Sequence, residues 1–309
     1  MPRIAYIDKN FRANSLELIE HVNGVVDEYR AQGYSLTLRQ VYYQMVARDI
    51  IPNNERSYKN LGELINNARL AGLVDWNAIE DRTRNLRTLG SWSNPQEIIE
   101  AVAHQYRLDW WEGQENYVEV WVEKDALVGI VGQICEELDV SYFSCRGYVS
   151  QSELWGAAMR MQQHERAGKH TVLLHLGDHD PSGRDMSRDI VDRLELFGTS
   201  DVEFHRLALN MSQIEQYGPP PNPTKLTDSR SGGYIEEFGH ECWELDALEP
   251  QVITELIKVN VNKYRDERLY KRVKAREAEE RGQLIRLRDG YEVLAENWDE
   301  IADTYGLDD

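Results

Sequence analysis

The chain of 309 residues has only three cysteines, Cys135, Cys145 and Cys242, which are widely spaced and form no CxxC pair. This scarcity argues against a disulfide framework and against a cysteine zinc site, and it makes the reducing cytoplasm the expected location. No apolar run approaches the roughly 18 residues of a membrane helix. The first residues, MPRIAYIDKNFR, also lack the apolar core of a secretory signal. We therefore expect no membrane partner.

The sequence also lacks the short motifs of several large enzyme classes. The stretch RAGKHT (Arg166–Thr171) has no upstream glycine of the GxxxxGK[ST] type, so no P-loop ATPase is expected. No GxGxxG follows a strand-like run, and neither HExxH nor GxSxG occurs. These absences disfavour dinucleotide binding, zinc proteolysis and serine hydrolysis.

Positive charge is scarce as well, with 35 Lys and Arg against 54 Asp and Glu and a net charge of −19. DNA-binding proteins usually show a basic surface, so the total charge at first argues against nucleic acid. The charge is uneven, however, because residues 37–91 contain eight Lys or Arg and six Asp or Glu. A local patch can contact phosphates in an acidic protein, and the composition therefore leaves the partner open.

Helical periodicity dominates the first hundred residues, where helices are expected over residues 14–30, in the stretch around residues 35–46, and over residues 58–71. A polar and partly basic face accompanies the last of these helices and the segment after it, and its candidate DNA contacts are Lys59, Asn66, Arg69, Arg82, Arg84 and Arg87. Compact helices with such a face resemble a helix-turn-helix or winged-helix arrangement. The alternative is a plain helical domain with solvated charges.

The second helix, in SLTLRQVYYQMV, contains two adjacent tyrosines that cannot face the same way. Thr37 and Gln40 have the spacing of a capping box, which predicts where the helix begins. Tyr42 lies on the apolar stripe and is expected to be buried, whereas Tyr43 points away from it, one turn after Arg39.

From residue 116 the pattern changes to short β-rich runs that alternate with helical segments. The runs cover residues 117–123, 140–145, 170–178 and 202–209. This alternation predicts an α/β fold with a parallel sheet covered by helices on both faces, and sites in such sheets lie at the carboxyl ends of the strands. The expected division is a helical domain over residues 1–105, a sheet domain over 106–215, and a loop and helical extension over 216–309.

Two of the β-rich runs end in carboxylates. Glu123 follows the first run, and Asp178 and Asp180 follow the third in LGDHDPSG. If the two strands are neighbours, the three acids converge, and an oxygen-only set of this kind suits Mg²⁺ or Mn²⁺. The alternative is that the two aspartates only cap the helix that begins at Pro181.

Several of these motifs together resemble a known family. VEKDAL, RGYVS and GDHDPSG resemble the TOPRIM domain, and more narrowly that of topoisomerase VI A subunits and the related meiotic double-strand-break proteins. LRQVYYQ resembles the family's Arg-x-x-Tyr-Tyr-like stretch, and WELDAL (Trp243–Leu248) is similar to a less specific motif near its C-terminus. Arg146 and Val149 stand where the family more often shows lysine and proline. With the Pro-rich loop at residues 217–234, they indicate a divergent branch of the kind that phages or mobile elements carry.

The resemblance implies a winged-helix domain followed by a TOPRIM domain, with Tyr43 as the nucleophile and Arg39 beside it. Glu123, Asp178 and Asp180 match the family's metal-binding acids, and Lys124 and Arg146 within the same motifs are expected DNA contacts. The implied activity is Mg²⁺-dependent transesterification of double-stranded DNA, which leaves a 5′-phosphotyrosyl link and a double-strand break. The implied partners are a second copy of the chain and a separate GHKL-type ATPase subunit, at the nucleoid in the cytoplasm.

Two other functions stay open at this point. In the first, the chain is a TOPRIM nuclease of the type found in Wadjet plasmid defence, where metal-activated water cuts DNA and Tyr43 only contacts the backbone. In the second, the chain is a non-catalytic DNA-binding subunit whose acids are vestigial.

Overall fold

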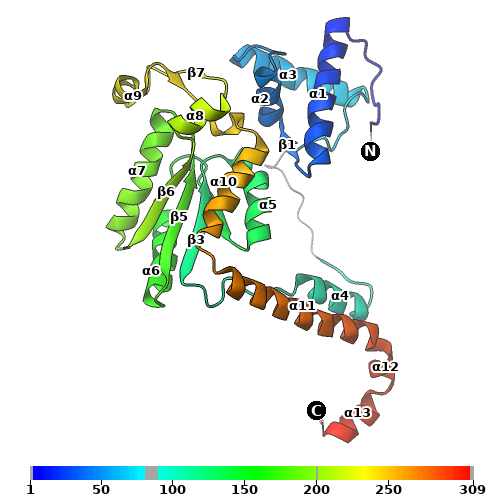
Figure 1. The fold of residues 1–309 in the computed structure, drawn as a ribbon. Helices are drawn as coiled ribbons and strands as arrows, with labels where there is room; N and C mark the ends of the chain where they lie inside the picture. The colour runs from blue at the N-terminus through cyan, green and yellow to red at the C-terminus, as the bar shows by residue number, and fades with distance from the viewer. Residues whose placement is uncertain (1–2, 81–89, 200, 307–309) are drawn as a thin grey trace. The chain divides into compact units, whose positions relative to one another are not determined.

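The computed structural model describes residues 3–80, 90–199 and 201–306, which belong to two compact units (Figure 1). One unit joins Met1–Arg84 with Glu115–Tyr264, and the other joins Asn85–Gln114 with Arg265–Asp309. The first unit therefore contains both the tyrosine-bearing helix and the strand-end acids. These two units are defined by packing. The three domains expected from the sequence, with boundaries at residues 105 and 215, stay a prediction.

The N-terminal part of the first unit is helical. Its elements are α1 (Ala13–Ala31), β1 (Leu36–Thr37), α2 (Leu38–Ala47), α3 (Glu55–Leu70) and β2 (Ile79–Glu80), with β1 and β2 paired in parallel. Helix α2 begins at the predicted capping box, in which the Thr37 N–H donates to Gln40 Oε1 at 2.8 Å and the Gln40 N–H donates to Thr37 Oγ1 at 3.4 Å. Tyr42 is buried as predicted.

The α/β class is confirmed by a four-stranded sheet in the second half of this unit. Its strands are β3 (Asn116–Val122), β4 (Ser141–Ser144), β5 (His170–Leu176) and β6 (Val202–Ala208). All three pairings are parallel and the order is β4-β3-β5-β6, so β3 and β5 are neighbours. The four strands lie where the β-rich runs predict them.

Helices cover both faces of this sheet (Figure 1). They are α5 (Val128–Leu138), α6 (Gln151–Arg166), α7 (Pro181–Leu196) and α10 (Pro250–Asn262). Trp121 and Leu173 pack with Leu154 of α6 and Ile190 of α7 in one core cluster. Because side chains alternate along a strand, the buried Val120, next to Trp121, faces the opposite layer, where α5 and α10 pack against each other.

A short 3-10 helix, η1 (Asp125–Leu127), lies between β3 and α5. The other short elements follow the sheet and lead back toward the tyrosine helix. They are α8 (Met211–Tyr217), β7 (Asn222–Pro223), α9 (Ser231–Phe238), β8 (Glu241–Cys242) and η2 (Leu245–Ala247). Strands β7 and β8 pair antiparallel, and η2 packs against α2. The WELDAL segment thus joins the two halves of this unit.

The regular elements among the described residues of the second unit are all helices, namely α4 (Pro95–Gln105), α11 (Glu267–Asp289), α12 (Tyr291–Glu296) and α13 (Trp298–Tyr305). Helix α4 packs along α11. The buried Glu277 of α11 accepts hydrogen bonds from the Leu108 N–H at 2.8 Å and the Trp110 indole at 2.6 Å. None of the helices described in either unit has the length and apolar character needed to cross a membrane.

The capping box of α2 gives a stability prediction. Thr37→Ala removes the side chain that accepts from the Gln40 N–H, and we expect the free energy of unfolding to fall by about 1 kcal/mol in urea titrations. Ser35→Ala, at an exposed position just before the helix, is the matched control and is expected to change it by less than about 0.5 kcal/mol. Equal effects of the two substitutions would contradict the capping role.

A second prediction concerns Glu203 of β6, whose pKa is lowered to about 2 by hydrogen bonds from Tyr264, His170 and His205. A carboxylate with a depressed pKa stabilises the fold above its unfolded value of about 4.3 and loses this contribution as the pH falls toward 2. The stability advantage of the wild type over Glu203→Gln should therefore be full at pH 6 and shrink between about pH 4.5 and 2. Glu215→Gln, at an exposed side chain of α8, is the control, and its difference in stability from the wild type should not shrink over this pH range.

Candidate functional site

The strand-end acids meet at one edge of the sheet. Glu123 directly follows β3 and Asp178 follows β5, and the Asp178 N–H donates to Glu123 Oε2 at 2.9 Å. Asp180 has the alternative role left open by the sequence, because its carboxylate accepts the Gly183 N–H at 2.6 Å and caps α7. The neighbouring, parallel strands thus bring Glu123 and Asp178 into contact, as the strand order requires.

Burial sets the electrostatics of these acids. Glu123 and Asp178 are 8% and 5% exposed. Burial raises the pKa of Glu123. Burial also raises the pKa of Asp178 to about 8, with Glu123 and Asp246 adding to the effect and Lys124 opposing it. A buried carboxylate is unfavourable as a free anion, so a nearby cation stabilises its ionised form.

Arg206 of β6 supports the turn that carries the aspartates, and sequence reasoning missed it. Its guanidinium donates to the carbonyls of Gly177 at 3.1 Å, Gly183 at 2.9 Å and Asp178. Burial lowers the pKa of Arg206 to about 10, and the positive charge faces the acids from the adjacent strand. A basic residue within the otherwise apolar end of a predicted strand was the only signal for it.

Lys124 occupies the centre of the acidic cluster. Its Nζ lies 2.9 Å from Asp178 Oδ2, 2.7 Å from Glu244 Oε2 and 2.9 Å from Asp246 Oδ1. Glu244 and Asp246 belong to the WELDAL segment, and neither was predicted to be a site residue. Lys124, an expected DNA contact, therefore contacts carboxylates of its own chain here.

Arg39 and Tyr43 join this cluster from helix α2. The Arg39 guanidinium is paired with Glu244 and, through Nε at 2.9 Å, with Asp246 Oδ2. The Asn222 amide lies 3.4 Å from Tyr43 Oη and 3.4 Å from Glu244 Oε1. One connected group of side chains thus links the expected nucleophile to the strand-end acids.

Tyr43, which was expected to point off the apolar stripe of α2, is buried and only 3% exposed. It belongs to the same core cluster as Tyr42 and Ala247, and η2 packs against α2. A segment some 200 residues later in the chain thus packs on this helix, and the helical period of α2 alone does not reveal it.

This burial also changes the chemistry expected of Tyr43. Burial raises its pKa, and Glu244 and Asp246 raise it further, while Asn222 and Arg39 lower it by less. Arg39 therefore lowers the pKa of Tyr43, but the larger opposing effects keep the phenol protonated in this arrangement.

The expected DNA contacts are spread over different surroundings. Lys59 and Asn66 are exposed on α3, where Lys59 pairs with Glu55 at 2.7 Å. Arg69 instead donates to the Ile79 carbonyl at 2.6 Å and ties α3 to β2. Arg146 is exposed beyond β4, with Nε 3.0 Å from Asp125 Oδ1. Arg82, Arg84 and Arg87 lie outside the described residues.

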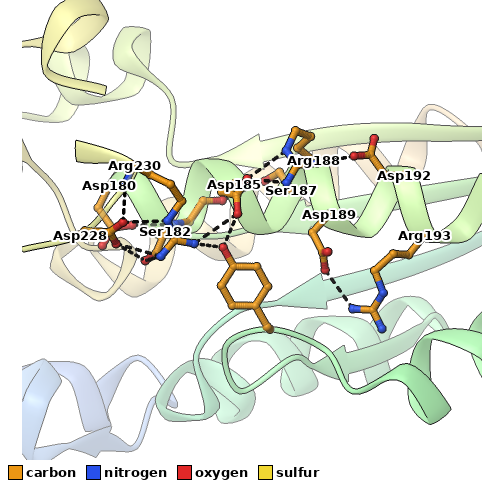
Figure 2. Close-up of polar contacts among 12 residues, drawn as sticks. Asp180, Ser182, Asp185, Ser187, Arg188, Asp189, Asp192, Arg193, Asp228 and Arg230 are labelled. Atoms are coloured by element: carbon orange, nitrogen blue, oxygen red, sulfur yellow. Dashed lines mark hydrogen bonds and ion pairs between the residues drawn. The ribbon is translucent and has the colours of Figure 1, made fainter. Parts of the chain in front are cut away.

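The Pro-rich loop is anchored to α7 by Arg230, beside the site (Figure 2). The Arg230 guanidinium pairs with Asp228 at 2.8 Å and with Asp185 at 3.2 Å, and donates to Ser182 Oγ at 3.1 Å. It also contacts the Tyr148 hydroxyl in the RGYVS turn. These contacts hold in place the loop that lies between Asn222 and the WELDAL segment.

Metal-binding potential depends on Glu123, Asp178 and Asp180. Within the part of the chain that the structure describes, no three His, Cys, Asp or Glu side chains form a group able to hold a metal ion. Both oxygens of Asp178 are engaged, Oδ1 by the Leu245 N–H at 2.7 Å and Oδ2 by Lys124. The donors nevertheless fit Mg²⁺ in kind, since they are carboxylate oxygens at a strand edge.

Comparison with known proteins finds no matching family model, no similar curated protein and no similar solved structure. The function of the chain is therefore argued from its own motifs and geometry.

Close packing at the turn gives a further prediction. A Cβ on Gly183 would lie 2.3 Å from the Asp178 carbonyl oxygen and 3.0 Å from Glu123 Oε2, so Gly183→Ala must displace the turn. We expect a loss of about 1–3 kcal/mol in the free energy of unfolding.

Gly156→Ala in α6 is the matched control, because its Cβ meets nothing within 4 Å. Alanine is favoured over glycine inside a helix by about 0.5–1 kcal/mol, so this variant should be as stable as the wild type or more stable. A Gly183→Ala variant that unfolds with the same midpoint as Gly156→Ala would contradict the packing argument.

Proposed function

We propose that the chain is a topoisomerase VI A-like enzyme that cleaves double-stranded DNA through Tyr43. The observation that carries the proposal is the single network that joins Tyr43 and Arg39 of α2 to Lys124 and the strand-end acids. The resemblance of the motifs in their order along the chain supplies the reaction class. The proposal includes a winged-helix role for the N-terminal helices and a TOPRIM role for the sheet.

The reaction is a transesterification at a DNA phosphate. Tyr43 Oη forms a bond to phosphorus while the bond from phosphorus to the 3′ oxygen breaks, so the 5′ end stays on the protein and the other strand end leaves as a 3′-hydroxyl. The proton lost by Tyr43 is matched by the proton that the leaving oxygen gains. Arg39 and Lys124 would hold the phosphate and neutralise its charge, and Asn222 would orient the attacking hydroxyl.

The proposal includes Mg²⁺, for which Mn²⁺ can substitute, at Glu123, Asp178 and Asp180. When bound, the metal would supply electrophilic stabilisation of charge on the phosphate and the leaving oxygen. Asp178 would have to exchange its contact with Lys124 for the metal, and the released Lys124 ammonium would then be available to a phosphate. The raised pKa of the buried acids supports a site that is stabilised by cations.

The partners follow from this reaction and from the resemblance. The exposed Lys59 and Asn66 of α3 would contact the DNA backbone near Tyr43, and Arg146 would contact it near the acids. A second copy of the chain would cut the opposite strand, and a separate GHKL-type ATPase subunit would control the two cuts. Such an assembly would work at the nucleoid in the cytoplasm.

A second candidate is a TOPRIM nuclease in which metal-activated water attacks the phosphate and Tyr43 only contacts DNA. The burial of Tyr43 and its raised pKa favour this alternative, because both oppose a tyrosine nucleophile. A third candidate is a DNA-binding subunit without activity. In that case the acids and their cations would only stabilise the fold.

Denaturing gels of labelled duplex DNA incubated with the protein and Mg²⁺ separate the three. For the leading proposal we expect a covalent protein–DNA adduct that is lost in Tyr43→Phe and in Asp178→Asn. Tyr42→Phe is the matched control. It removes a hydroxyl that bonds the Asn54 N–H at 2.8 Å, so it should lower stability by about 1–2 kcal/mol and still form the adduct.

Cleavage that survives Tyr43→Phe but not Asp178→Asn would instead establish the nuclease. The absence of cleavage with Mg²⁺ and with Mn²⁺, in the presence of an ATPase partner, would favour the DNA-binding subunit.

A further inference from the structure

The carboxylate of Glu244 lies between two cations beside the proposed nucleophile. The same oxygen, Oε2, contacts both Arg39 and Lys124, the latter at 2.7 Å. Its other oxygen, Oε1, is 3.4 Å from the Asn222 amide, which also reaches Tyr43 Oη. Two cations and an amide donor around one oxyanion are the groups that proteins use to hold a phosphate.

The two cations do not need Glu244 to stay in place. Asp246, whose side chain is fully buried, contacts Lys124 Nζ and Arg39 Nε, each at 2.9 Å. Asp178 pairs with Lys124 as well. Lys124 therefore keeps Asp178 and Asp246 as partners, and Arg39 keeps Asp246, when Glu244 moves away.

Glu244 is also the member of the group that is best placed to leave. Its side chain is 22% exposed, whereas that of Asp246 is 0% exposed. It is ionised, because Lys124 and Arg39 outweigh the effect of burial and lower its pKa to about 2. It precedes η2 in extended backbone, so its side chain can swing without unwinding a helix.

We propose that Arg39, Lys124 and Asn222 of one chain form a binding site for a DNA backbone phosphate and that Glu244 occupies this site as a stand-in anion until DNA displaces it. This inference rests on the proposed function and adds regulation to it. The chain is then self-inhibited in the absence of DNA, since the same carboxylate blocks the site and helps to keep Tyr43 protonated. Displacement of Glu244 would open the site to a DNA phosphate.

The test measures DNA binding without cleavage, by fluorescence anisotropy of a labelled duplex in EDTA. Glu244→Gln keeps the shape of the side chain and removes its charge, so we expect the variant to bind about tenfold more tightly than the wild type. Glu241→Gln is the matched control. It removes the same charge from an exposed side chain in the same segment, and it should stay within about twofold of the wild type.

Two further variants locate the effect. Glu244→Gln combined with Arg39→Gln should lose the gain in affinity, because one cation of the site is gone. Glu244→Ser, which shortens the side chain, should show the same gain as Glu244→Gln and serves if the glutamine variant folds poorly. Thermal unfolding of each variant checks that the differences in binding come from folded protein.

Two results would overturn the inference. One is a Glu244→Gln affinity no tighter than that of Glu241→Gln, with both proteins folded. The other is a gain that persists after Arg39→Gln. Nitration of Tyr43 by tetranitromethane, read by mass spectrometry, adds a measurement that needs no DNA, and it should rise in Glu244→Gln and not in Glu241→Gln.

These results are independent of the proposed reaction. If Glu244→Gln binds DNA tightly but forms no adduct with Mg²⁺, the phosphate site stands and the tyrosine reaction fails. If the wild type forms the adduct and Glu244→Gln gains no affinity over the control, the reaction stands and the stand-in role fails.

Discussion

The contact of Lys124 with the buried carboxylates of Asp178 and Asp246 is the interaction on which the rest of the site depends. A buried ammonium must be paired, and the loss of one partner from such a group usually costs several kcal/mol. Lys124 lies at the carboxyl end of β3, Asp178 at that of β5, and Asp246 in the segment that packs on α2. One side chain thus connects the sheet edge to the tyrosine helix.

The ion network is compatible with the proposed phosphate site in a chain with a net charge of −19. Salt screens exposed charges that lie more than about 8–10 Å apart, so nearby groups dominate the interactions of a bound anion. Arg39, Lys124 and Arg206 are the cations of this site, and they lie among the acids. The acidity of the remaining surface then affects solubility and long-range approach more than recognition.

The elements of the fold could be predicted from local patterns. Short β-rich runs located all four strands, since a strand buried on both faces needs a nearly continuous apolar run. The Thr37 and Gln40 pair located the start of α2, because a capping box involves residues only three apart. The burial of Tyr42 followed from the same helical period. The meeting of Glu123 and Asp178 required only that β3 and β5 be neighbours.

The sequence by itself therefore determined the α/β class, the strands and the strand-end acids, because each depends on residues that are close along the chain. Only the tertiary structure decided the burial of Tyr43, the inward position of Lys124 and the roles of Glu244 and Asp246. These features depend on contacts between residues far apart in the chain, such as Arg39 with Glu244 and Lys124 with Asp246, and no local period reports on them. Periodicity shows that a side chain leaves one apolar face, but it cannot show whether a distant segment returns to cover that side chain.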